Sequence, residues 1–183
     1  IRNQNELAQE SSEIADFWSM LQGFQTSGKC IEKAHYRIRY MKSFRPLSVK
    51  EDIEFKEARP ILYLNTAAVA SLFNSRNAGS TSNRSNWSTI MSYLKSHASY
   101  LGLKQDRFTI LLPSGLPDYT IDIVNGEQVK KVKVNRPKAL CFDYLQLKET
   151  FGLDLETEVV SEVQEEMPVE QQHPIKQEEL HFR

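Results

Sequence analysis

The stretch SNWSTIMSYLKSHASYLG, residues 85–102, decides the fold that we expect. Its apolar side chains recur at helical spacing from Trp87 to Leu101, which predicts an amphipathic helix that Gly102 stops. The opposite positions carry Ser and Thr with one Lys, whereas a solvated helix normally carries longer charged side chains there. Short hydroxyl side chains allow another surface to approach the helix closely and to hydrogen-bond with it. The composition of this face therefore predicts contact with a partner.

The segments on either side predict a mixture of helices and strands. Apolar spacing predicts a first helix over 11–28, a short helix after Thr66 and a last helix that ends at Gly152. The Asn-Gly dipeptide at 125–126 predicts the turn of a hairpin. Alternating or apolar runs predict strands at 30–41, 53–64 with a break at Pro60, 107–113, 119–124, 129–134 and 139–144.

The order of these elements is that of a winged helix, apart from a β-hairpin inserted after the first helix. In such a fold the second and third helices form a helix-turn-helix and the late hairpin forms the wing. We expect an α+β fold with a winged-helix-like domain over 11–155. An N-terminal extension over 1–10 precedes it, and a disordered acidic tail over 156–183 follows it.

The charge is divided unevenly along the chain. Residues 154–183 carry nine acidic and two basic side chains, whereas residues 1–153 carry an excess of six cations. A basic domain with an acidic tail favours a polyanion as the partner, or a tail that competes with one; a solvated surface of mixed charge is the alternative. No apolar run is long enough to span a bilayer, and no signal peptide is evident, so we expect a cytoplasmic protein with no membrane contact.

The polar face of the 85–102 helix and the basic hairpin together predict a nucleic-acid interface. The helix carries no acid, and residues 130–138 carry five cations and no acid. Hydroxyl groups suit base edges and phosphates, and a basic strand suits the phosphate backbone. The alternative is that the small-residue face packs on another protein element. The residues that we expect to contact DNA are Arg84, Ser88, Thr89, Ser92, Lys95, Ser96, Ser99, Lys130, Lys131, Lys133 and Arg136.

A second basic stretch, HYRIRYMKSFR at 35–45, interleaves cations with aromatic residues. Exposed aromatic rings beside cations hold single-stranded nucleic acid in many proteins. The alternative is a strand that buries its aromatic rings while its Arg side chains are solvated.

Catalytic and metal-binding patterns are absent from the sequence. It has no Gly-rich phosphate loop, zinc-protease motif or serine-hydrolase motif, and its His and Cys residues lack metal-ligand spacing. We expect Cys30 and Cys141 to be buried thiols and His97 to lie at the boundary of its helix's two faces. The sequence therefore predicts no catalytic residue, metal or cofactor within this segment.

The C-terminal peptide QEELHF, residues 177–182, resembles the short motifs by which bacterial replication proteins grip the sliding clamp. Gln177, Leu180 and Phe182 have the spacing of those motifs, and QEEMPV at 164–169 is a looser copy. In such motifs the Gln makes polar contacts while the Leu and the aromatic ring fill an apolar pocket. The resemblance implies a sliding clamp as a partner of the tail.

The element order, with ARPILYL at 58–64 and CFDYLQLKETFGL at 141–153, resembles a known family over about 11–155. It looks like the region after the ATPase core in primase–helicase-type replication proteins of bacterial mobile elements and phages, notably from Bacteroides-type genomes. The resemblance implies a winged-helix DNA-binding domain attached to a helicase or primase. Because the first residue is Ile1 rather than Met, we expect a piece of a longer polypeptide.

Two other functions fit the same sequence. The first is a protein-interaction or oligomerisation module, in which the Ser-rich helix contacts another subunit. The second is an initiator that recognises repeats at a replication origin by itself.

Overall fold

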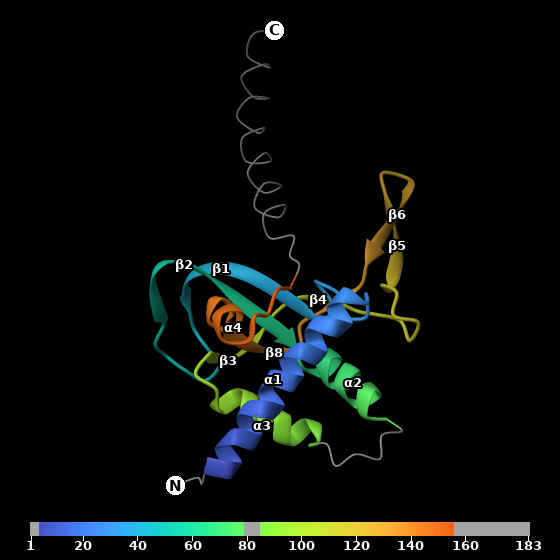
Figure 1. Ribbon diagram of the computed structural model, residues 1–183. Coiled ribbons are helices and arrows are strands. Elements are labelled where there is room, and N and C mark those ends of the chain that lie inside the picture. The colour runs from blue at the N-terminus through green and yellow to red at the C-terminus, as the bar shows by residue number, and fades with distance from the viewer. Residues whose placement is uncertain (1–3, 79–84, 156–183) are drawn as a thin grey trace.

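The computed structural model describes residues 4–78 and 85–155. Within them the chain has four helices and antiparallel sheets (Figure 1), which confirms the α+β class. The elements in chain order are α1 (Gln4–Thr26), β1 (Tyr36–Phe44), β2 (Ile53–Asn65), α2 (Thr66–Asn77), α3 (Trp87–Ser96), β3 (Tyr100–Gln105), β4 (Phe108–Thr109), β5 (Tyr119–Val124), β6 (Glu127–Val132), β7 (Val134–Asn135), β8 (Lys138–Asp143) and α4 (Tyr144–Phe151).

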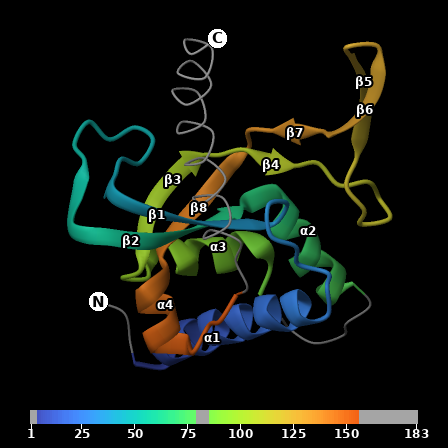
Figure 2. The ribbon, with the colours of Figure 1, turned by 90° about the horizontal axis from the view of Figure 1, so that it is seen from above.

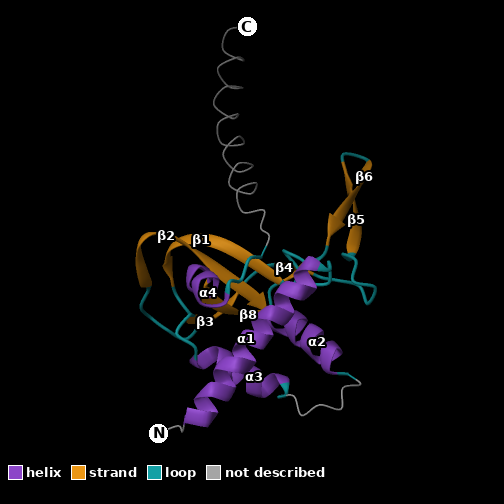
Figure 3. Ribbon diagram, viewed as in Figure 1, coloured by secondary structure: helices purple, strands orange, loops and turns teal. Residues whose placement is uncertain are grey.

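The main sheet has four antiparallel strands in the order β1-β2-β8-β3. Helices α1, α2 and α3 lie together on one side of it (Figure 2), and Figure 3 shows β5 and β6 as a separate hairpin that projects from the body. The apolar side chains of the inner sheet face and of the helices form the larger core. Trp18 of α1 packs edge-on against Phe142 of β8 with 5.1 Å between the ring centroids, and Leu94 of α3 is fully buried. Burying this apolar surface is the main source of the fold's stability.

The other face of the sheet encloses a smaller core, because the sheet curls until its two edge strands approach each other. Phe44 and Phe108 pack there with Ile61 and other residues of the outer face. The Leu47 backbone N–H, just after β1, donates to the Leu103 carbonyl of β3 at 2.8 Å. Two hydrogen bonds of 2.7 and 3.0 Å also join the Arg39 guanidinium of β1 to the carboxylate of Asp106, which directly follows β3.

Several predicted boundaries are wrong because pairing between distant segments overrides the local pattern. The helix predicted over 85–102 ends at Ser96, since Tyr100–Gln105 pairs with β8 as strand β3. Gly102 stops no helix; it lies at a register shift of β3 with φ +134°. The first helix is already formed at Gln4, and β1 begins only at Tyr36.

Other boundaries follow from local chemistry. Strand β2 runs straight through Pro60, where no break occurs, because its pairing with β8 begins only at the next residue. The Asn125-Gly126 turn forms as predicted, with φ +53° and +80°. Gly152 ends α4 in the left-handed conformation, also as predicted. No described helix is both long and apolar enough to cross a membrane.

Candidate nucleic-acid interface

Two of the Ser residues predicted to face outward, Ser85 just before α3 and Ser96 at its end, contact helix α1. The Ser96 hydroxyl donates to Glu10 Oε1 at 2.6 Å, and the Ser85 hydroxyl donates to Glu13 Oε1 at 2.6 Å. Glu10 is buried, and a carboxylate in a partly dry site needs such donors. The absence of acids from α3 is therefore explained in part by the acids that α1 presents to it. The expectation that small residues allow a close approach is correct, but at these two positions the neighbour is the chain itself.

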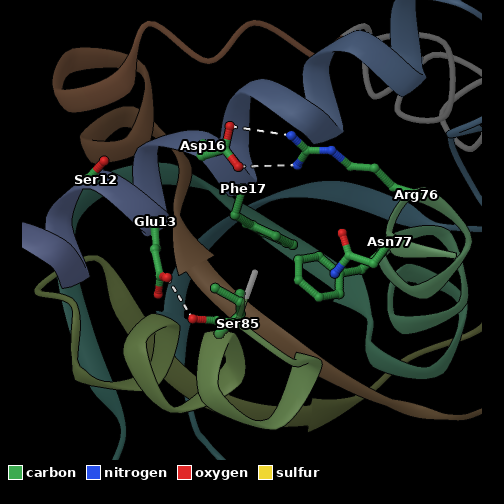
Figure 4. A pocket seen from close by; sticks show the side chains of 9 residues that line it. Ser12, Glu13, Asp16, Phe17, Arg76, Asn77 and Ser85 are labelled. Carbon is green, nitrogen blue, oxygen red and sulfur yellow. Dashed lines mark hydrogen bonds and ion pairs between the residues drawn. The ribbon is translucent and has the colours of Figure 1, made fainter. Parts of the chain in front are cut away.

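A cavity of about 260 Å³ lies between α1, the end of α2 and the start of α3 (Figure 4). Its lining includes the carboxylates of Glu13 and Asp16. Arg76 is paired with Asp16, with an Nη1–Oδ2 distance of 3.2 Å. Glu13 Oε2 and Asn77 Oδ1 are buried and have no hydrogen-bond partner among the described residues. Buried acceptors beside acids repel phosphate, so this side of α3 is a poor site for a nucleic-acid backbone.

The residues around α3 that were predicted to contact DNA fall into three groups by their exposure. Ser88, Ser92, Lys95 and Ser96 are exposed, as expected, although the Ser96 hydroxyl also donates to Glu10 of α1. Thr89 is half-buried, and its hydroxyl donates to the helix-capping Asn86 Oδ1 at 3.0 Å. Ser99 is fully buried, with its hydroxyl 2.7 Å from His97 Nδ1, so its predicted outward orientation is wrong. The reason is that the helix has already ended before it.

The contact between α3 and α1 can be tested by removing both hydroxyl groups, in the double variant Ser85→Ala/Ser96→Ala. We expect the free energy of unfolding to fall by about 1–3 kcal/mol, because two carboxylates lose donors in a partly buried contact. Urea denaturation measures this change. The matched variant Ser88→Ala/Ser92→Ala removes exposed hydroxyls and is expected to change stability by less than about 0.5 kcal/mol. Equal effects of the two pairs would contradict the assignment.

A group of exposed cations lies where the segment joining β3 to β4 pairs with the segment joining β7 to β8. Pairing of Gln105 with Lys138 and of Phe108 with Asn135 continues one antiparallel ladder, and Asp106 N–H donates to the Pro137 carbonyl between them. This register sets Arg107 directly opposite Arg136. Alternation places four exposed residues on one side of the ladder, which we call the cationic face: Gln105, Arg107, Arg136 and Lys138.

The cationic face has an unusual electrostatic arrangement. Like charges directly opposite each other destabilise an antiparallel pair. Neither Arg107 nor Arg136 has a carboxylate partner within the described ranges 4–78 and 85–155. The carboxylate of the intervening Asp106 is buried and bound to Arg39. The Arg37 side chain lies against the same segment, since its Nη1 donates to the Arg107 backbone carbonyl at 2.9 Å. This arrangement suits a bound anion that lies between the guanidinium groups.

The predicted basic face of the late hairpin is divided by the structure. Lys130 and Lys131 point to opposite faces of the β5–β6 hairpin, and Lys130 lies over the Tyr119 ring at 4.4 Å. Lys133 Nζ is 3.2 Å from Asp118 Oδ2, so this lysine forms an ion pair at the base of the hairpin. Arg136, by contrast, belongs to the cationic face. The three lysines of this segment therefore differ in what surrounds them.

Arg107 and Lys138 complete a face that the predicted site did not include. In the sequence, positions 105 and 107 are two residues apart, and so are positions 136 and 138, which is the spacing of side chains on one face of a strand. It becomes informative only when the two segments are known to pair.

In the 35–45 stretch Tyr36 and Phe44 are buried, so the alternative of a strand with buried rings applies to both. Arg84, Gln177, Leu180 and Phe182 lie outside the described residues.

A groove of about 870 Å³ lies between the start of α2 and the 109–116 loop. His35 and Lys29 are the titratable residues that line it. Burial lowers the pKa of His35, whose Nδ1 accepts the Ile31 N–H at 3.0 Å, so the ring is neutral near pH 7. Among the residues that the structure describes, its lining includes no acid that could form an acid–base pair with His35.

Neither thiol has the properties of a nucleophile. Cys30 and Cys141 are buried and free, as expected, and burial raises the pKa of Cys30 to about 12. No cluster of His, Cys, Asp and Glu in the described part of the chain could hold a metal ion.

No protein-family model matches the chain, and neither a curated protein nor a solved structure matches it.

Proposed function

We propose that this chain binds DNA and that the cationic face is its main phosphate contact. The observation that carries the proposal is the opposed, exposed pair Arg107 and Arg136. A phosphate between two guanidinium groups removes their repulsion and accepts hydrogen bonds from both. Lys138 extends the same face along the strand, and a row of cations suits a polymer of phosphates better than it suits a single small anion.

The setting that we propose is a DNA replication protein of a bacterial mobile element or phage, attached to a primase or helicase. The resemblance of ARPILYL and CFDYLQLKETFGL supports this setting. We also propose a winged-helix arrangement, in which α2 and α3 form the helix-turn-helix. The succession of α2, α3, β3 and a projecting hairpin supports it. In this arrangement the exposed Ser88, Ser92 and Lys95 of α3 contact the DNA beside the cationic face.

The proposal predicts DNA binding that weakens steeply with salt. Fluorescence anisotropy of the whole chain with a labelled 20-base-pair duplex and with a single strand measures it between 50 and 300 mM NaCl. We expect a Kd in the micromolar range at low salt, and log affinity falling against log salt with a slope of about −3, because each neutralised phosphate contributes about 0.9. Affinity that does not change with salt, or no binding to either form, would overturn the proposal.

A further inference from the structure

The hairpin of β5 and β6, which we call the arm, projects away from both cores (Figure 1). Its base is fixed to the body at one junction. The Asp118 N–H donates to the Ile110 carbonyl at 2.9 Å, and the Lys133 N–H donates to the Asp118 carbonyl at 2.8 Å. The Lys133–Asp118 ion pair lies at the same place. The arm is therefore held in a defined direction at its base while its length lies in solvent.

The two faces of the arm differ in charge. In an antiparallel pair, residues directly opposite each other share a face. One face, which we call the apolar arm face, carries no acid and consists of Tyr119, Ile121, Ile123, Gln128, Lys130 and Val132. The other face carries Asp122 and Glu127 together with Lys131.

The isoleucines of the apolar arm face are among the most exposed apolar side chains described. Ile121 is 66% exposed and Ile123 is 75% exposed. The residues opposite them are Lys130 and Gln128, so cross-strand packing covers little of their surface. Isolated two-stranded hairpins are only marginally stable in water, and a contiguous apolar surface outside the core marks an interaction site. The apolar arm face is therefore suited to contact a partner.

We propose that the apolar arm face enters the minor groove of duplex DNA, where Ile121 and Ile123 wedge between base pairs and unstack them. This inference rests on the proposed DNA binding. Aliphatic side chains act as such wedges in proteins that bend DNA through the minor groove. Each strand of the arm has six residues, which span about 20 Å, roughly the width of a duplex.

Charge and continuity favour DNA as the occupant. Strand β6 leads through Lys133 into β7 and the cationic face, so phosphates held at Arg107 and Arg136 bring the duplex to the base of the arm. Lys130 lies among the apolar residues, where it can reach a phosphate at the edge of the groove. A second copy of the chain packed on the same face would bury two Lys130 side chains, and neither copy offers an acid there to pair with them.

The test uses a 20-base-pair A·T-rich duplex that carries 2-aminopurine, a base whose fluorescence rises when it is unstacked. We expect the whole chain to raise this fluorescence severalfold at saturation. The variant Ile121→Thr/Ile123→Thr keeps β-branched side chains and is expected to remove most of the rise and to weaken binding by about tenfold. The salt slope should not change, because the phosphate contacts are intact. The control Val124→Thr/Val129→Thr alters the opposite face and should behave as the wild type.

The outcomes separate this inference from the proposed function. Salt-dependent DNA binding without any fluorescence rise overturns the wedge and leaves DNA binding in place. A rise that persists in Ile121→Thr/Ile123→Thr also overturns it. If sedimentation instead finds a dimer that this variant dissociates, the apolar arm face is a protein interface and the inference is wrong. The absence of DNA binding by the wild type overturns both proposals.

Discussion

Replacing Arg107, Arg136 and Lys138 together with Glu is expected to lower DNA affinity by about 100- to 1,000-fold at 100 mM salt. Each of these cations is exposed on the cationic face, so each is available for a charge-assisted hydrogen bond to a phosphate oxygen. Loss of about one such contact per residue, at about 1.4 kcal/mol each, corresponds to about tenfold per position. Fluorescence anisotropy with the labelled duplex measures the effect. Because the three side chains point into solvent, the fold itself should be unaffected.

A matched variant separates this site from the general effect of charge. Lys42, Lys50 and Lys56 are exposed cations of the β1–β2 region, which lies at the opposite end of the molecule from the arm (Figure 2). Changing these three to Glu alters the net charge by the same amount. We expect a loss of affinity of less than about fivefold, since screening weakens charges that lie beyond about 10 Å. An equal loss in the two triple variants would contradict a localised phosphate site.

Gly102→Ala is expected to be the most damaging small substitution, lowering the free energy of unfolding by about 2–4 kcal/mol. Gly102 has φ +134°, a conformation that residues with a side chain rarely adopt. An added Cβ would lie 2.6 Å from Pro46 Cβ and 2.9 Å from Pro46 Cγ. Pro46 precedes Leu47, whose N–H bond to the Leu103 carbonyl closes the curled sheet. The substitution therefore strains the backbone and also separates β1 from β3.

Gly23→Ala provides the control, measured by the same urea denaturation. Gly23 lies in α1, and nothing lies within 4 Å of where its Cβ would be. Alanine in a helix interior is expected to stabilise the protein by about 0.5–1 kcal/mol relative to glycine. A Gly102→Ala protein as stable as the wild type would contradict the close approach of β1 and β3.

Local features of the fold were predictable because a few neighbouring residues determine them. The Asn125-Gly126 turn needs two residues with positive φ, and Gly152 ends α4 for a similar reason. The apolar spacing that identifies α3 also holds from Trp87 to Leu94. The same spacing fails to locate the end of α3, because Leu101 takes part in a strand whose partner, β8, lies about forty residues further along the chain.

The candidate site was predictable only in part, for the same physical reason. Ser96 and Glu10 are separated by 86 residues, and nothing near Ser96 in the sequence shows that a carboxylate accepts its hydrogen bond. The opposition of Arg107 and Arg136 likewise depends on a ladder between distant segments. Composition draws attention to the cations of 130–138, but it cannot show that Lys133 forms an ion pair with Asp118.

The central claim is that the cationic face holds DNA phosphates, and the salt dependence of binding tests it most directly. The measurement compares log affinity against log salt for the wild type and for the Arg107→Glu/Arg136→Glu/Lys138→Glu variant. If each of the three cations contacts one phosphate, the slope of the variant is shallower than that of the wild type by about three. Two parallel lines would mean that these residues release no counterions from DNA, and they would contradict the claim.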